Sequence, residues 1–225
     1  MKLYFHPAST TSRPVVLFAT ESGIDLQYEI VDLFTGAQYK PEYAAINPNN
    51  QVPVLEDGDF RLTESSAILK YLADKINSPA YPKDLRERAR VNERMDWFNT
   101  GFYRDFSYGF VYPQIFPFMK RSDPVVQAAT IDWGKERATK WLKVLDEAII
   151  GPRNGYVCGE RITIADYLGG VMIAGGDAIE CNFARFPNIA RWRKNMHALK
   201  SWDKVHEVFN KALIEPNRGK EFVRI

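Results

Sequence analysis

Four consecutive hydroxyl side chains, Ser9 to Ser12, follow the first apolar segment of this 225-residue chain. An apolar pattern with helical spacing begins directly after them, at Pro14. A hydroxyl beside the positive end of a helix can donate a hydrogen bond to an anion, and the helix dipole adds to the stabilisation. The same residue types are common in turns and as N-caps. The segment is a candidate anion site, with capping as the alternative.

A second polar group, Thr63 to Ser66, stands directly before another helical pattern. The Ser65 hydroxyl and N–H suit a carboxylate, because helix N-termini bind anions. The neighbouring Glu64 carboxylate can hold an amine. The alternative is a helix cap with an acidic first turn.

An aromatic run marks the first long helical segment of the C-terminal part. Aromatic residues recur on every side of a helix there, so a share of them must line a pocket rather than a core. They are Trp97, Phe98, Phe102, Tyr103, Phe106, Tyr108, Phe110, Tyr112, Phe116 and Phe118.

The N-terminal third carries the patterns of a small α/β unit. Strands are predicted at Lys2 to Phe5 and Gln27 to Val31, with a helix over Pro14 to Glu21 between them. Such a βαβ unit has parallel strands and a right-handed connection. After a Pro-bearing helical stretch at Lys40 to Ala45, the Asp57-Gly58 pair between two apolar runs predicts an antiparallel hairpin.

A helix from Ser65 to Lys75 should cover this sheet. Residues 1–76 are therefore predicted as one domain, 77–84 as a linker and 85–225 as an all-helical domain. Pro113 and Pro117 should bend or end the first long helix. The helical runs are Leu85 to Met119, Val125 to Ile149, Ile164 to Ala174, Ile189 to Leu199 and Trp202 to Leu213.

Composition narrows the class of protein. The net charge is only +2 and no block of like charges occurs, so nucleic acid is not an expected partner. No segment has the apolar length of a membrane span, which predicts a soluble, cytoplasmic protein. Cys158 and Cys181 are too few for a disulfide framework and lack metal-ligand spacing, so neither a metal nor a disulfide is expected. Residues 1–75 carry 6 basic and 10 acidic side chains, and the remainder carries the basic excess.

The βαβ-then-ββα order, Val52-Pro53, Glu64-Ser65 and the helical remainder resemble the cytosolic glutathione transferases over essentially the whole chain. The segments Asn47 to Pro53 and Ile162 to Tyr167 look most like the serine-dependent theta and delta classes. This resemblance implies an α/β plus all-α fold, in which a thioredoxin-like domain precedes a helical-bundle domain. It also implies a homodimer.

The resemblance assigns roles to the polar segments. Ser9 matches the residue that donates to the thiolate of glutathione, while Thr10 and Thr11 remain alternatives and Ser12 is a cap. Val52 is expected to pair through both its N–H and its C=O with the cysteinyl backbone of glutathione, beside a cis Pro53. Glu64 and Ser65 would hold the γ-glutamyl group.

The residues expected at the glycyl end of bound glutathione depart from the family pattern. Gln38, Asn50 and Gln51 stand where relatives carry histidine or lysine. Neutral amides add no charge, so affinity for glutathione should be modest unless Lys40 reaches in.

The resemblance also makes part of the aromatic run the wall of the second-substrate pocket. Tyr103, Phe106 and Tyr112 are the candidates, and Arg104 could bind an acidic substrate group. Thr163 and Asp166 form a predicted capping box that serves folding.

The expected activity is attack of the glutathione thiol on a small, apolar or aromatic electrophile, with glutathione as co-substrate and no permanent cofactor. Isomerisation, ether cleavage or dehalogenation at the same site is the alternative, as is a non-catalytic interaction protein. A redox role is disfavoured because no cysteine precedes Cys158.

Overall fold

The computed structural model describes all residues, 1–225, and begins with a four-stranded sheet of order β2-β1-β3-β4. The strands are β1 (Lys2–Phe5), β2 (Gln27–Ile30), β3 (Val54–Asp57) and β4 (Phe60–Leu62). Strands β1 and β2 are parallel, whereas β3 is antiparallel to both β1 and β4. Gly58 turns the hairpin with a φ of 65°, a conformation that glycine adopts without steric cost. The predicted βαβ unit and hairpin are confirmed.

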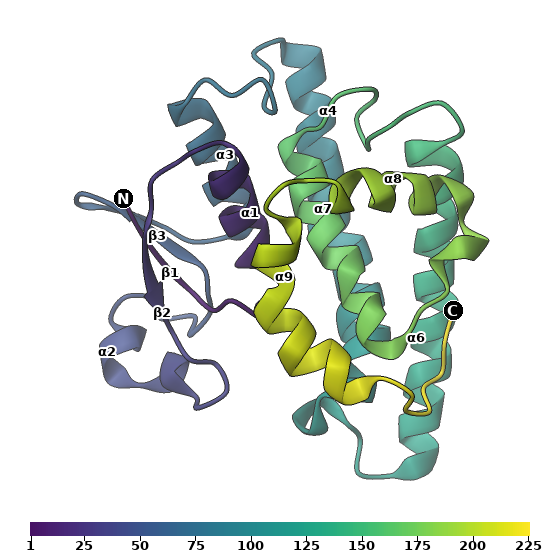
Figure 1. Cartoon of the computed structure of the whole chain (residues 1–225). Coiled ribbons are helices and arrows are strands. Elements are labelled where there is room, and N and C mark those ends of the chain that lie inside the picture. Colours follow the sequence, from purple (N-terminus) through teal and green to yellow (C-terminus); the bar gives the residue numbers. More distant parts are fainter.

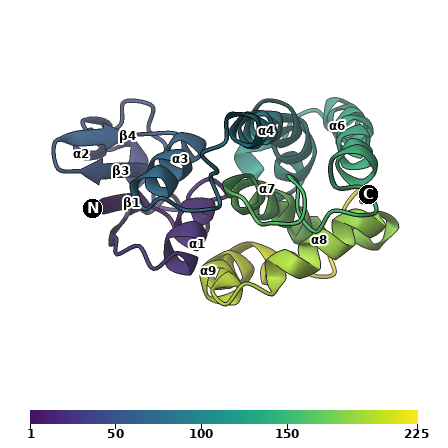
Figure 2. The same ribbon diagram turned by 90° about the horizontal axis from the view of Figure 1, so that it is seen from above.

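Helices cover both faces of the sheet (Figure 1). Helices α1 (Arg13–Glu21) and α3 (Ser65–Lys75) lie between the sheet and the helical part, as the view from above also shows (Figure 2). The short helix α2 (Pro41–Ala44) and the 3₁₀ turn η1 (Ala37–Tyr39) lie on the other side. There a small apolar cluster forms from Tyr4, Val31, Tyr43, Val52 and Val54.

The C-terminal part is entirely helical. No strand occurs after β4, and no helix of the structure is long and apolar enough to cross a membrane. Its helices are α4 (Leu85–Asp96), continued by η2 (Trp97–Val111) and α5 (Tyr112–Ile115); α6 (Pro124–Val144), continued by η4 (Leu145–Ile150); α7 (Ile164–Ala174); α8 (Pro187–His197); and α9 (Trp202–Phe209), continued by η7 (Asn210–Ile214). Short 3₁₀ turns, η3 (Pro117–Met119), η5 (Gly175–Ile179), η6 (Phe183–Arg185) and η8 (Glu215–Asn217), connect or end them.

The first long helix departs from the sequence-based prediction. Its hydrogen bonding widens to the π type at Trp97, well before Pro113, and Pro113 lies in the first turn of α5. Phe116, which precedes Pro117, has an extended backbone and ends the helix. Pro117 therefore acts as predicted, whereas the change at Trp97 has no sequence signal.

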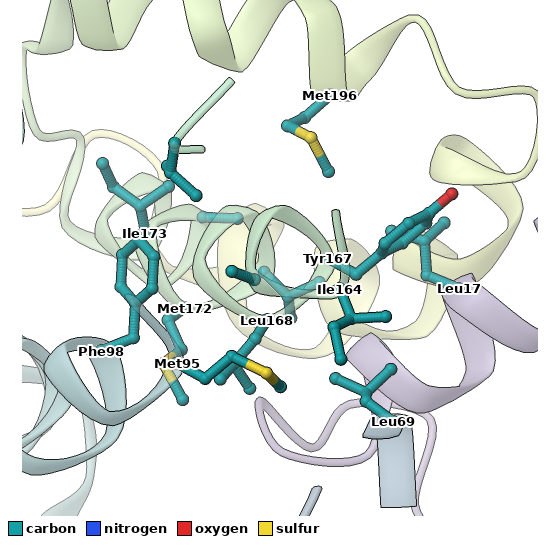
Figure 3. Close-up of a cluster of buried hydrophobic side chains, with 14 of the residues drawn as sticks. Leu17, Leu69, Met95, Phe98, Ile164, Tyr167, Leu168, Met172, Ile173 and Met196 are labelled. Carbon is teal, nitrogen blue, oxygen red and sulfur yellow. The ribbon is translucent and has the colours of Figure 1, made fainter. Parts of the chain in front are cut away.

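Helix α7 is the centre of the common core, and all of its residues are buried. Figure 3 shows Leu17 of α1, Leu69 of α3, Met95 of α4 and Met196 of α8 gathered around Ile164, Leu168 and Met172. Phe18 of α1 also meets Tyr167 edge to face, with ring centroids 5.2 Å apart. One apolar interior thus joins the α/β part to the helical part.

Asp166 ties the start of α7 to its neighbours, and the predicted capping box is confirmed. Its buried carboxylate accepts hydrogen bonds from the N–H groups of Val157 and Thr163, both at 2.8 Å, and from Trp192 Nε1 at 3.0 Å. Burial raises the pKa of Asp166 to about 6 in spite of these donors.

We expect Asp166→Ala to lower the free energy of unfolding by at least about 3 kcal/mol, because several buried donors would each lose their acceptor. Urea denaturation measures this. Asp123→Ala is the matched control, since Asp123 caps α6 through the N–H groups of Val125 and Val126 but is exposed. Its loss should stay within the range of a cap, about 0.5–2 kcal/mol. Equal losses in the two variants would contradict the role of Asp166.

Candidate active site

A cavity of about 1110 Å³ opens between the α/β part and the helical part. Its first wall comes from the β1–α1 turn, the segment before β3 and the start of α3. Its second wall comes from η2, α5 and the end of α9.

Ser9 lies on the first wall and is half-buried. Its Oγ accepts hydrogen bonds from the N–H groups of Thr11, at 3.3 Å, and Ser12, at 3.2 Å. Thr11 Oγ1 lies 3.1 Å from Ser9 Oγ and donates its own proton to the Val52 carbonyl at 2.8 Å. Two N–H groups therefore polarise the Ser9 oxygen. Because Thr11 gives its proton to Val52, the Ser9 hydroxyl donates to Thr11 Oγ1 within the chain and can turn its proton to a ligand.

The neighbouring hydroxyls have other partners. Thr10 Oγ1 accepts from the Tyr112 hydroxyl at 2.9 Å, and Tyr112 in turn lies 3.0 Å from the Tyr103 hydroxyl. Ser12 is fully buried and accepts the His6 N–H at 3.4 Å. Thr10 lines the cavity and keeps a proton to donate, so it remains an alternative to Ser9, whereas Ser12 faces the interior.

A buried cation stands behind these hydroxyls. Arg13 is 1% exposed, its Nε donates to the Ser9 carbonyl at 3.4 Å, and its guanidinium stacks 3.7 Å from the centre of the Phe209 ring. Neither terminal nitrogen has a hydrogen-bond partner. Burial lowers the pKa of Arg13 to about 9, which still leaves it charged at neutral pH. No sequence signal indicated that Arg13 would be buried with its terminal nitrogens unpaired.

The Val52-Pro53 peptide bond is cis, as the resemblance implied. The Val52 N–H donates to no atom of the chain. Its carbonyl already accepts from Thr11, but an oxygen with two lone pairs can accept a second hydrogen bond. Both backbone groups of Val52 can therefore pair with a ligand, and this pairing stays a prediction.

Glu64 and Ser65 also line the cavity. Glu64 has a φ of 65°, which is uncommon for a residue with a side chain and is typical of functional positions. Neither side chain caps α3, contrary to the capping role that the sequence suggested. The Glu64 carboxylate and the Ser65 hydroxyl have no hydrogen-bond partner in the chain, so both can serve a ligand.

The amide side chains predicted to bind the glycyl end of glutathione also lie at the cavity. Gln38, Asn50 and Gln51 line it, and the backbone of Gln51 is held by Tyr43 and Asn47, both at 2.7 Å from its carbonyl oxygen. Lys40 does not line the cavity. It is exposed at the N-cap of α2, so the expectation that it contributes is not supported.

Only two of the three aromatic residues predicted for the second-substrate pocket line the cavity. Tyr103 and Tyr112 line the second wall. Phe106 is fully buried and stacks on Phe102 with centroids 4.8 Å apart, so its assignment to the pocket is wrong.

Arg104 is a second correction, because it binds within the chain instead of facing the cavity. Its Nε donates to the buried Asp105 carboxylate at 2.8 Å. Arg137 and Trp141 of α6 donate to the same carboxylate at 2.8 and 2.6 Å. Burial alone would raise the pKa of Asp105, but these donors hold it well below its usual value. Asp105 thus links η2 to α6, and Arg104 is held by this carboxylate.

Several wall residues were not singled out from the sequence. Tyr108, Phe116 and Phe118 belong to the aromatic run, which indicated a pocket without indicating which rings face it. The others carry no sequence signal, and most come from segments distant from that run: Phe34, Tyr39, Ile115, Phe209 and Leu213.

Comparison with known proteins agrees with this geometry. Residues 1–74 match the glutathione S-transferase N-terminal domain model, and residues 111–200 match the C-terminal one. Glutathione S-transferase theta-3 of Mus musculus is 32% identical over 221 residues, covering 94% of this chain and 89% of the relative. Glutathione S-transferase theta-1 of Homo sapiens is also 32% identical, covering 94% of this chain and 90% of the relative.

The chain belongs to the glutathione S-transferase family. Solved structures of glutathione transferases share its fold. A human theta-2 enzyme in complex with glutathione superposes with a TM-score of 0.87 and 28% identity, covering all of this chain and 93% of the other. A delta-class enzyme of Nilaparvata lugens gives 0.83 and 30%, covering 96% and 98%. The resemblance and the fold class inferred from the sequence are confirmed.

The roles of individual site residues in this glutathione transferase remain predictions, and Ser65 allows a clear test. We expect Ser65→Ala to weaken glutathione binding about tenfold, as loss of a hydrogen bond to a charged group does. The free energy of unfolding should change by less than about 0.5 kcal/mol, because the hydroxyl has no partner within the chain. Calorimetry and urea denaturation measure the two effects.

Ser66→Ala, one position further along α3, is the control and should bind glutathione like the parent. A Ser65 variant that loses stability while keeping its affinity would mean that the residue is only structural.

Proposed function

We propose that Ser9 stabilises the thiolate of bound glutathione for attack on a small electrophile. The chain is a glutathione transferase, and glutathione is its co-substrate. The observation that carries the role of Ser9 is the geometry of its hydroxyl, which accepts two N–H bonds at the start of α1 and lines the cavity, where its proton can turn from Thr11 Oγ1 to a ligand.

A free thiol has a pKa near 8.5, so little thiolate exists at neutral pH, although the thiolate is the nucleophile. A donor that has itself accepted two N–H bonds makes a stronger charge-assisted hydrogen bond. The positive end of α1 and the unpaired guanidinium of Arg13 add favourable electrostatic potential. These groups together favour ionisation of a thiol placed beside Ser9.

The second wall supports an apolar or aromatic electrophile. The rings of Tyr103 and Tyr112, with Ile115 and Phe116, face the cavity opposite Ser9. Holding both reactants between these walls replaces a bimolecular encounter, and this proximity supplies part of the rate enhancement.

Isomerisation, ether cleavage and dehalogenation would use the same thiolate, and substrate profiling distinguishes these reactions from conjugation. A non-catalytic interaction protein would turn over none of these substrates. A cytoplasmic location remains a prediction.

We expect Ser9→Ala to lower kcat for conjugation at least about tenfold, because a hydrogen bond to a charged group is worth about 1.5–3 kcal/mol. The pKa of the bound thiol, read from the pH dependence of thiolate absorbance, should rise as well. Ser22→Ala, at the opposite end of α1, is the control and should leave both values unchanged. Full activity of Ser9→Ala would transfer the role to Thr10 or Thr11, each of which is then replaced singly.

We also propose that the protein is a homodimer. In this arrangement, the β4 and α3 side of one copy meets the α4 and α6 helices of its partner. Large apolar side chains are exposed on both surfaces: Phe60 of β4 is 45% exposed and Trp133 of α6 is 55% exposed. The acidic excess of the N-terminal part and the basic excess of the remainder would assist encounter.

Sedimentation equilibrium at micromolar concentration should give about twice the chain mass of 25.9 kDa. Trp133→Glu should shift the protein towards monomer, because it places a charge in the apolar contact. Tyr28→Glu is the matched control, since Tyr28 is exposed to a similar extent on β2, at the opposite edge of the sheet from β4. A single species at the monomer mass in the parent protein would refute the dimer.

A further inference from the structure

The mouth of the cavity carries the most exposed aromatic side chains of the protein. Phe118 is 83% exposed, Tyr39 71% and Phe34 62%, more than any other phenylalanine, tyrosine or tryptophan. All three line the cavity, although they come from different segments of the chain. Exposed apolar side chains that gather at one place mark a binding surface, whereas scattered ones need no explanation. The mouth is therefore a candidate extension of the substrate site.

A row of rings leads from the neighbourhood of Ser9 to this mouth. Tyr112, whose hydroxyl donates to Thr10, meets the ring of Phe116 with centroids 5.2 Å apart. Phe116 then stacks on Phe118, with centroids 5.4 Å apart. Exposure increases along the row, because Tyr112 is buried, Phe116 is half-buried and Phe118 is exposed. The row thus connects the proposed place of the thiol with solvent.

The rings on both sides of the mouth are held in place. The Phe34 N–H donates to Asp32 Oδ1 at 2.9 Å, and the Phe34 ring meets the ring of His6 edge to face, with centroids 4.8 Å apart. On the other side, Phe118 is supported by its stack on Phe116. Because these rings are already placed, covering them with a ligand costs little side-chain ordering.

No charge is recognised along this row. None of the residues that line the cavity is a lysine or an arginine, and the one acidic residue, Glu64, is assigned to the amino end of glutathione. His6 is neutral at physiological pH, because burial lowers its pKa. A charge that leaves water without a partner is costly. The part of a substrate that lies on the row is therefore uncharged.

The orientation of the rings favours a flexible ligand over a rigid one. The planes of Tyr112 and Phe116 differ by 63°, and those of Phe116 and Phe118 differ by 21°. The row therefore offers no common plane on which a fused-ring molecule could lie against all three. An unbranched chain can contact each ring in turn and bury its methylene groups, which is favourable in proportion to the apolar area covered.

We propose that the second substrate is an uncharged electrophile with an unbranched apolar tail. Its electrophilic head lies beside Ser9, and its tail follows Tyr112 and Phe116 to the mouth, where Phe118 and Phe34 cover it. The inference rests on the proposed function, which places the thiol at Ser9, and it adds the class of the second substrate.

A homologous series of straight-chain trans-alkenals, from butenal to decenal, tests the proposal with glutathione and the full chain. The thiolate adds to the β-carbon, the C=C π bond breaks, and the α-carbon takes up a proton in place of the one that the thiol released, so no group leaves. After subtraction of the uncatalysed rate, kcat/KM should rise at least about twofold for each added methylene, since complete burial of a CH₂ group would give about fourfold. A flat profile would overturn the proposal and would favour a protein partner at the mouth.

Variants at the mouth give a second check. Phe118→Ser should lower the ratio of kcat/KM for decenal to that for butenal at least about fivefold, because the tail loses an apolar contact. Phe118→Leu should keep most of this ratio, since it remains apolar. Ile30→Ser is the matched control: Ile30 is also exposed, but it lies on β2 outside the cavity, and its replacement should leave the ratio unchanged. An unchanged ratio in Phe118→Ser would refute the role of this ring.

Unreactive ligands separate this inference from the proposed function. Saturated alkanols of the same chain lengths cannot react with a thiol, and calorimetry in the presence of glutathione measures their Kd. If their affinity rises with chain length while no electrophile is conjugated, the tail surface stands and the role of Ser9 is wrong. If the alkenals are conjugated equally well at every length and the alkanols bind no better as they lengthen, the proposed function stands and the tail surface is wrong.

Discussion

Helix α1 is packed on two sides, and this constraint fixes the groups at its N-terminus. One side faces the sheet, and the other faces α7, where Phe18 meets Tyr167 (Figures 1 and 2). The helix cannot shift without opening the shared core, so the N–H groups that hold Ser9 Oγ are rigid. The bond from Thr11 to the Val52 carbonyl then aligns the β1–α1 turn with the segment before β3. Preorganised donors of this kind need no rearrangement when negative charge develops on a ligand.

Much of this architecture follows from local sequence signals. The Asp57-Gly58 turn and the capping box at Thr163 each satisfy backbone groups within a few residues, and so their positions were predicted from short segments. The start of α3 at Ser65 was predicted from the helical pattern that follows it, because no side chain caps this helix. The hydroxyls and the aromatic run were indicated by their own residue patterns, whereas the amides were placed at the site by the resemblance to a family alone.

The assignments that failed depend on three-dimensional partners. Helical spacing cannot say which face Phe106 occupies, because the π-type segment from Trp97 changes the number of residues per turn. Arg104 is bound by its neighbour Asp105, whose burial depends on α6. The burial of Arg13 and the bond to the Val52 carbonyl likewise join segments that only the folded chain brings together. The resulting site holds the unpaired guanidinium of Arg13 behind Ser9.

The region where α6 passes η2 sets a limit on how this protein can be re-engineered. Gly134 approaches the backbone of Gly109 so closely that any β-carbon would overlap it, and a β-carbon at Gly101 would overlap the ring of Trp141. The distance between these helices is thus determined by main-chain contact. Libraries that seek a wider substrate range must vary the rings that project into the cavity, such as Tyr108 and Phe116, because the helical scaffold behind them has no room to adapt.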